Sequence, residues 1–311
     1  MFASAVVVVA LVAVVLPAAL VGLVLWVVRR AHDADGAPAR AARRHELVVS
    51  TVATSAAVVC TIVLVAQPVV GPGWAPAPGT LQAVAPFAVA LVFCTVRAVG
   101  EQTWPRPRGQ VRSAPLVRRT VRSLGGVRLR LALATAGGLG LALIACGLTA
   151  DLTGRAFPTG PAAVPDGGVV TGASGPYPGW PYGVPMLLGL VVTVVATLLT
   201  LRTITRRPPL HGVPAPDDDA VRATSAARLL GAVQLCLGVA LGSTLAVAGN
   251  AVRVGGEGLA INGAPTGGLV ALGVALSLAG LAVAVASVVT AILAAWPQTP
   301  RRAATSTLAA A

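Results

Sequence analysis

Apolar residues occur along this chain in long uninterrupted runs, without the spacing of 3.6 or 2.0 residues that marks half-buried helices and strands. Uncharged apolar runs of about 18 or more residues are typical of membrane-spanning helices. The pattern predicts an all-α bundle of seven transmembrane helices, at residues 2–28, 47–70, 81–96, 131–150, 184–201, 229–249 and 267–296. We therefore predict a polytopic integral membrane protein with a single transmembrane domain, residues 1–311.

The first apolar run, residues 2–28, is followed at once by Arg29 and Arg30. A signal peptide instead carries its positive charge before a short apolar core and ends at a small-residue cleavage site. We therefore expect this run to be retained as a membrane-spanning helix.

Composition supports the membrane assignment and excludes one class of protein. Only 11% of the 311 residues are charged and the mean hydropathy is +0.83, whereas a soluble domain is about 25% charged. All 23 basic residues are arginine, and the net charge is +13. Without lysine no retinal Schiff base can form, so a retinal photoreceptor is excluded.

The arginines fall on alternate sides of the predicted spans. Segments 29–46, 97–130, 202–228 and 297–311 hold 21 of them, whereas segments 71–80, 151–183 and 250–266 hold 2. Cytoplasmic loops of membrane proteins carry the excess of basic residues. We therefore predict a multi-pass protein of the cell (plasma) membrane with its N-terminus outside and its C-terminus in the cytoplasm. Arg97, at the end of the third run, is expected to snorkel to the interface.

The basic cytoplasmic loop 97–130 carries a predicted interfacial helix at about 116–124, which Gly125 and Gly126 end. On a helical wheel its apolar residues face one way, and Arg118, Arg119 and Arg122 face the other. Such a helix lies against a bilayer surface, so the predicted partners are the lipid bilayer and its anionic inner-leaflet lipids. Trp104 is expected near the lipid boundary. The loop has no nucleic-acid-binding module, and we predict no nucleic-acid partner.

The core of this loop, G-E-x-T-W-P-R-P-x-G-x-V-R from Gly100 to Arg112, resembles a stretch of uncharacterised multi-pass membrane proteins of high-GC actinobacteria. The resemblance covers this loop and the general composition. It implies no activity.

No catalytic arrangement is recognisable. The predicted spans have no Asp, Glu, His, Lys or Arg in their interiors, although such residues mark proton relays and substrate pathways. The three histidines, His32, His45 and His211, share no metal-ligand spacing. The four cysteines lie in separate apolar runs, which is typical of packing residues. We therefore predict that the chain is not an enzyme and has no cofactor or metal.

Two polar segments allow alternatives. Asp217, Asp218 and Asp219 fit the first turn of a helix, where acids are favourable, or a divalent-metal site. The Gly/Pro-rich extracellular loop 151–183 is expected to be irregular. Its aromatic residues fit a membrane-interface belt or a shallow external binding surface; they are Tyr177, Trp180 and Tyr182.

Small residues at four-residue spacing, Gly238 and Gly242 among them, predict close helix packing in the sixth span. Gln234 in the same span is interpreted as an interhelical hydrogen-bonding residue rather than a substrate contact. The leading functional prediction is a structural, scaffolding or accessory subunit that binds another membrane protein. The alternatives are a permease-like transporter of a neutral or lipophilic solute and a membrane enzyme of lipid or envelope metabolism.

Overall fold

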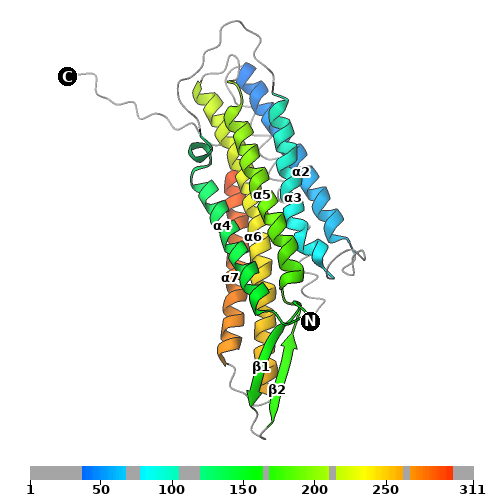
Figure 1. Cartoon of the computed structure of the whole chain (residues 1–311). Helices are drawn as coiled ribbons and strands as arrows, with labels where there is room; N and C mark the ends of the chain where they lie inside the picture. Colours follow the sequence, from blue (N-terminus) through cyan, green and yellow to red (C-terminus); the bar gives the residue numbers. More distant parts are fainter. Residues whose placement is uncertain are drawn as a thin grey trace, which may run out of the picture.

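The computed structural model describes residues 37–67, 78–104, 120–163, 168–209, 215–261 and 267–296. Six long helices run up and down a single bundle (Figure 1); they are α2 (Ala37–Val65), α3 (Thr80–Gln102), α4 (Val121–Thr149), α5 (Trp180–Arg206), α6 (Ala215–Ile261) and α7 (Gly267–Ala295). Each is long and apolar enough to cross a membrane. The prediction of a membrane-spanning helical fold is thus confirmed for six helices, while the first predicted span, residues 2–28, lies outside the described residues.

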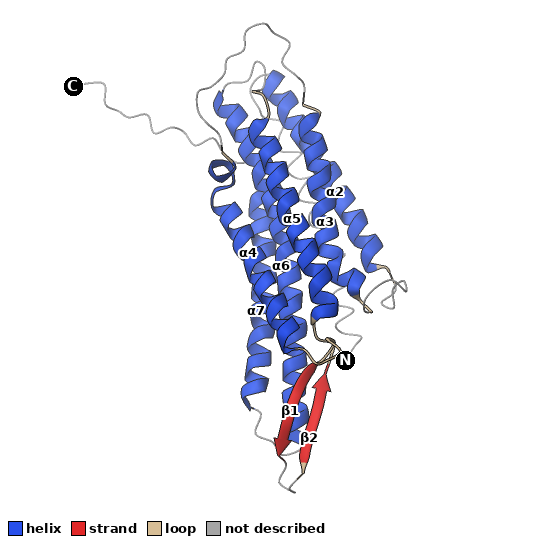
Figure 2. Ribbon diagram, in the orientation of Figure 1, coloured by secondary structure: helices blue, strands red, loops and turns tan. Residues whose placement is uncertain are grey.

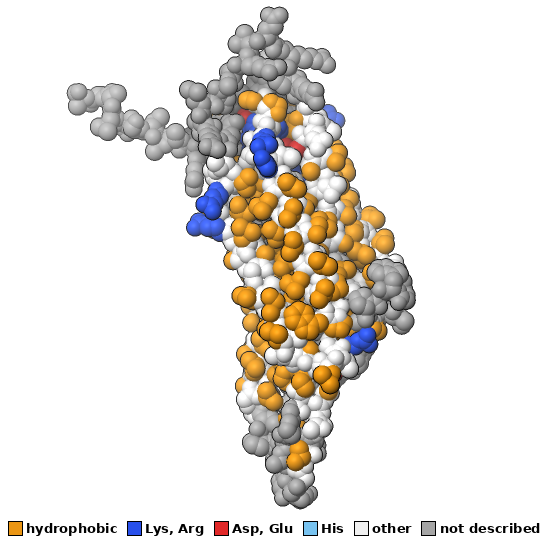
Figure 3. All heavy atoms as spheres, in the orientation of Figure 1, with side chains coloured by type: hydrophobic (Ala, Val, Ile, Leu, Met, Phe, Trp, Pro, Cys, Tyr) orange, Lys and Arg blue, Asp and Glu red, His pale blue; other side chains and the backbone are white. Residues whose placement is uncertain are grey.

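Apolar side chains cover the middle of the bundle on the face drawn in Figure 3. The large exposed apolar residues of the described helices include Leu188, Val191 and Leu281, whose exposure to water would be unfavourable but whose exposure to lipid is not. The helices are buried unequally: 61% of the most apolar part of α6 is buried inside the protein, against 11% for α2 and for α7. Helix α6 therefore forms the centre of the bundle, and α2 and α7 lie at its edges (Figure 1).

Helix α6 is much longer than a bilayer requires. Its 47 residues correspond to about 70 Å at 1.5 Å per residue, whereas the hydrocarbon core is about 30 Å thick. The predicted span 229–249 is only its middle part. One extension of α6 carries charged residues into the bundle, and the other packs against a β-hairpin.

That hairpin consists of β1 (Phe157–Ala163) and β2 (Val169–Ser174), which pair antiparallel beside the C-terminal end of α6 (Figure 2). The Ser174 hydroxyl donates a hydrogen bond to the Ala251 carbonyl of α6, and Gly255 leaves room for Thr159. The expectation of an irregular loop 151–183 was therefore wrong for these residues. Their strand pairing is supported by contacts with α6, which the Gly/Pro content of the loop does not reveal.

Helix α4 begins with a capping box in which Thr120 and Ser123 exchange hydrogen bonds. Thr120 itself has extended backbone angles, so α4 starts at Val121, five residues after the predicted start of the interfacial helix at residue 116. The expected break is present at Gly126, whose φ of 51° and ψ of −133° kink the chain; this positive φ favours glycine. Arg118 and Arg119 lie outside the described residues, and Arg122 is exposed.

Helices α6 and α7 touch through small residues. An added Cβ on Gly242 would lie 2.7 Å from the Gly280 carbonyl oxygen, and one on Gly280 would lie 2.5 Å from the Gly242 carbonyl oxygen. The same close approach recurs along the antiparallel pair, where Gly249 meets Gly273, Gly238 meets Ser287, and Gly231 meets Ala294. Gly238 and Gly242 thus pack within one bundle, through the kind of small-residue row that lets backbones come into contact.

Candidate functional site

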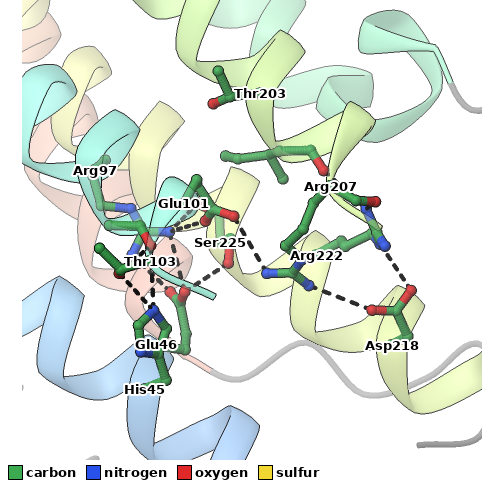
Figure 4. Close-up of polar contacts among 12 residues, drawn as sticks. His45, Glu46, Arg97, Glu101, Thr103, Thr203, Arg207, Asp218, Arg222 and Ser225 are labelled. Atoms are coloured by element: carbon green, nitrogen blue, oxygen red, sulfur yellow. Dashed lines mark hydrogen bonds and ion pairs between the residues drawn. The ribbon is translucent and has the colours of Figure 1, made fainter. Parts of the chain in front are cut away.

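Seven charged side chains meet between the helices at one end of the bundle, and Figure 4 labels all of them except Arg228. This charged cluster draws its members from α2, α3, α6 and the residue after α5, and consists of Glu46, Arg97, Glu101, Arg207, Asp218, Arg222 and Arg228. All are buried except the Arg228 side chain, which is 11% exposed. Ionisable groups buried in a membrane protein are the first place to look for function.

Glu46 is the centre of one half of the cluster. Arg97 of α3 donates to one carboxylate oxygen at 2.9 Å, and Arg228 of α6 donates to the same oxygen at 3.4 Å. The Ser225 hydroxyl of α6 donates to the other oxygen at 2.7 Å, and Ser50 of α2 adds a fourth contact at 3.1 Å. The hydrogen bonds of one carboxylate therefore connect α2 to both α3 and α6.

The second half of the cluster connects α3 to α6 across the end of α5. Glu101 lies 3.7 Å from Arg97 and 3.3 Å from Arg207, and Asp218 lies 3.5 Å from Arg207 and 2.9 Å from Arg222. Arg222 also satisfies the C-terminal end of α5, because its guanidinium donates to the carbonyls of Ile204, Arg207 and Pro208. This contact replaces hydrogen bonds that the last turn of a helix cannot make itself.

The aromatic residue Trp104 closes the cluster on one side. The Arg207 guanidinium carbon lies 4.0 Å from the Trp104 ring centre, and the His45 ring lies 4.4 Å from it on the α2 side. Trp104 is only 7% exposed. It was expected near the lipid boundary, but its ring is buried among protein side chains. A cation–π contact of this kind stabilises by about 2 kcal/mol when water is excluded.

The charges of the cluster nearly balance. Four arginines face three carboxylates, and burying each charge costs several kcal/mol, which only good pairing and hydrogen bonding offset. Burial lowers the pKa of Arg207, while Glu101 acts in the opposite direction. The guanidinium stays protonated, because arginine does not lose its proton in proteins. The Nε atoms of Arg97 and Arg207 have no hydrogen-bond partner within the described part of the chain.

One prediction about charge is therefore wrong. Arg97 was expected to reach the interface, but its side chain is 0% exposed, because Glu46 and Glu101 neutralise it between the helices. The predicted spans themselves hold no ionisable residue, but the helices extend beyond them, since α3 continues to Gln102 and α6 starts at Ala215. The helices are longer than the apolar runs, and their extra turns carry the charges inward.

The three consecutive aspartates, Asp217, Asp218 and Asp219, do not all have the same role in the structure. Asp217 and Asp218 lie in the first turn of α6, as one of the two interpretations expected. Asp218 additionally turns inward to Arg207 and Arg222, which gives it a role beyond the helix terminus. Among the residues that the structure describes, no three His, Cys, Asp or Glu side chains come together to hold a metal ion.

A second set of arginines surrounds the same end of the bundle on the outside. These exposed residues are Arg43, Arg44, Arg122, Arg130, Arg202 and Arg206. The opposite end carries Arg155 and Arg253, and Arg253 pairs with Glu257 of its own helix. The arginine asymmetry of the sequence is therefore an asymmetry between the two ends of the folded bundle.

The middle of the bundle contains a small polar junction. The Gln234 side-chain amide donates to the Thr135 hydroxyl of α4 at 2.9 Å and to the Ser287 hydroxyl of α7 at 3.2 Å. Its carbonyl oxygen has no hydrogen-bond partner in the described ranges. Gln234 thus joins three helices, as its interpretation as an interhelical residue expects.

Three aromatic residues of segment 151–183 occupy different environments. Tyr177 is buried, its hydroxyl lies 2.6 Å from the Thr149 hydroxyl, and burial raises its pKa to about 12. Trp180 begins α5 and is partly exposed, while the Tyr182 hydroxyl donates to the Pro78 carbonyl. Tyr177 therefore serves the packing of this end of the bundle and is not part of an external surface.

The fold and the charged cluster together define an all-helical, multi-pass membrane protein whose buried charges connect its helices. Comparisons of the chain with protein-family models, curated proteins and solved structures give no match.

Proposed function

We propose that the chain is a non-enzymatic integral membrane protein of the plasma membrane, which acts as a structural, scaffolding or accessory subunit of a membrane complex. One observation carries this proposal: each buried carboxylate of the described residues, namely Glu46, Glu101 and Asp218, is paired with buried arginine. Carboxylates that are paired with arginines from neighbouring helices hold those helices together. A proton relay or a general acid–base pair needs an ionisable group that faces substrate or water.

The two alternative functions have less support. A permease for a neutral solute needs polar groups along its path, and the amide of mid-bundle Gln234 is directed at Thr135 and Ser287 between helices. A membrane enzyme built on the aspartates needs free carboxylates, and Asp218 is held by two arginines. Both arrangements favour a packing role.

The proposed partner is a second membrane protein, bound through exposed apolar helix surface. We expect the chain, purified through a tag from native membranes in mild detergent, to retain that protein at a fixed ratio, because contacts between membrane helices survive gentle extraction. The same tag on an unrelated multi-pass protein is the control. Recovery of the chain alone, as a monomer, would contradict the proposal.

The proposed orientation places the arginine-rich end of the bundle in the cytoplasm, next to anionic inner-leaflet lipids. A periplasm-active reporter fused after Gly160, in the hairpin, is expected to be active, and one fused after Gly109, in the basic loop, to be silent. The opposite pair of results would reverse the orientation. Equal activity at both positions would contradict the proposed alternation of spans.

A further inference from the structure

Helix α2 is held tightly along only part of its length. Its buried residues are Ala42, Glu46, Val49, Ser50 and Ala53, all near the charged cluster. From Thr54 to Gln67 every residue of this segment is half-buried or exposed. Helix α2 contacts α6 much less than it contacts α3, so beyond Ala53 one long side of α2 has no protein neighbour among the described helices.

This free side of α2 is hollowed. A groove of about 640 Å³ runs along α2 from Thr51 to Leu64 and is bounded by Val92 of α3. At 1.5 Å per residue the groove extends for about 20 Å, most of the thickness of a bilayer core. Its floor includes small residues four apart, Thr51 with Ser55 and Ala56 with Cys60. Rows of this kind allow a second helix to approach closely.

We infer that the groove is filled by the N-terminal apolar segment of the same chain, residues 2–28, packed antiparallel to α2. This segment lies outside the described residues and is predicted from sequence to be a membrane-spanning helix. Only residues 29–36 separate it from Ala37, where α2 begins. Eight residues reach at most about 29 Å, or two to three helix diameters. The connection is therefore long enough for the segment to turn back along α2 and short enough to limit it to nearby surfaces of the same bundle.

Charge and residue size set the register of this contact. Arg29 and Arg30 end the segment, and Arg43 and Arg44 are exposed near the start of α2; arginines of neighbouring helices prefer the same depth at the membrane surface. With Arg29 level with Arg44, an antiparallel pair places small residues opposite small residues: Gly22 opposite Thr51, Ala18 opposite Ser55, and Ala13 opposite Cys60.

Cys60 makes this register testable, because it lines the groove and is a free thiol. The experiment uses the full chain in membranes, with Cys94, Cys146 and Cys236 replaced by alanine and a protease site inserted within residues 29–36. In this background Ala13→Cys is expected to cross-link to Cys60 under mild oxidation, so that the two proteolytic fragments stay joined on a denaturing gel. The matched control is Leu11→Cys, about 200° around the same helix, which is expected to cross-link several-fold less.

A second pair confirms that the modified chain is folded. Cys94 and Thr197 are in contact across α3 and α5, with 3.8 Å between the sulfur and the hydroxyl oxygen. Thr197→Cys with Cys94 retained and Cys60 replaced, in a chain whose protease site lies within residues 105–119 so that the two cysteines fall on different fragments, should therefore cross-link efficiently. Given that result, a Cys60–Cys60 dimer would show that a second copy fills the groove and would overturn the inference. Equal cross-linking from Ala13→Cys and Leu11→Cys, or none from either, would overturn it as well.

Discussion

Replacement of Glu46 by alanine is expected to destabilise the folded bundle by about 3–5 kcal/mol, the usual cost of removing one partner from a buried ion pair. Glu46 accepts hydrogen bonds from Arg97, Ser225 and Arg228. Without it, two arginines lose their shared carboxylate, and α2 loses its charged contact with α6. The measurement is the temperature at which half of the detergent-solubilised protein stops eluting as a single species.

Two further variants distinguish the loss of a buried ion pair from a general effect of mutation on stability. Glu257→Ala removes an exposed partner of Arg253 and should cost no more than about 1 kcal/mol. A triple variant, Glu46→Leu with Arg97→Met and Arg228→Met, removes Glu46 together with the two arginines that pair with it. It should be milder than Glu46→Ala, because apolar replacement of a complete buried ion pair or triad is often neutral. An unfolding temperature for Glu46→Ala equal to that of Glu257→Ala would show that the cluster does not stabilise the bundle.

The membrane-spanning helices could be predicted from sequence because the bilayer acts on each segment separately. A run such as 184–201 must satisfy its backbone within itself and expose apolar side chains to lipid, and α5 contains it entirely. The ends of the helices could not be predicted in this way. Helix α6 extends far beyond 229–249 because the charged cluster supports one end and the hairpin supports the other.

The charged cluster was missed because its stability depends on pairs that are distant in the chain. Arg97 and Glu46 are 51 positions apart, and Ser225 and Glu46 are 179 apart. Hydropathy averaged over neighbouring residues places Arg97 at the end of a predicted span, where its charge would be solvated by water. One signal was available: Glu46 and Glu101 are acids beside predicted spans, in segments dominated by arginine.

Replacement of Gly280 by alanine is expected to weaken the contact between α6 and α7 by about 1–3 kcal/mol, the usual cost of overpacking. The added Cβ would lie 2.5 Å from the Gly242 carbonyl oxygen and 3.1 Å from the Ala246 amide nitrogen. Both are backbone atoms, so relief requires the two helices to separate, and the row of small residues on either side loses contact as well. Gly280→Leu should cost more, because its larger side chain forces a wider separation.

Gly137 provides the matched control for this prediction. It lies in membrane-spanning α4, is exposed, and would have no atom within 4 Å of an added Cβ. In a helix without a steric conflict, alanine is more favourable than glycine by about 0.5–1 kcal/mol. The same substitution should therefore lower the unfolding temperature at Gly280 and leave it equal or higher at Gly137. An equal response at both positions would mean that the close approach of α6 and α7 contributes nothing to stability.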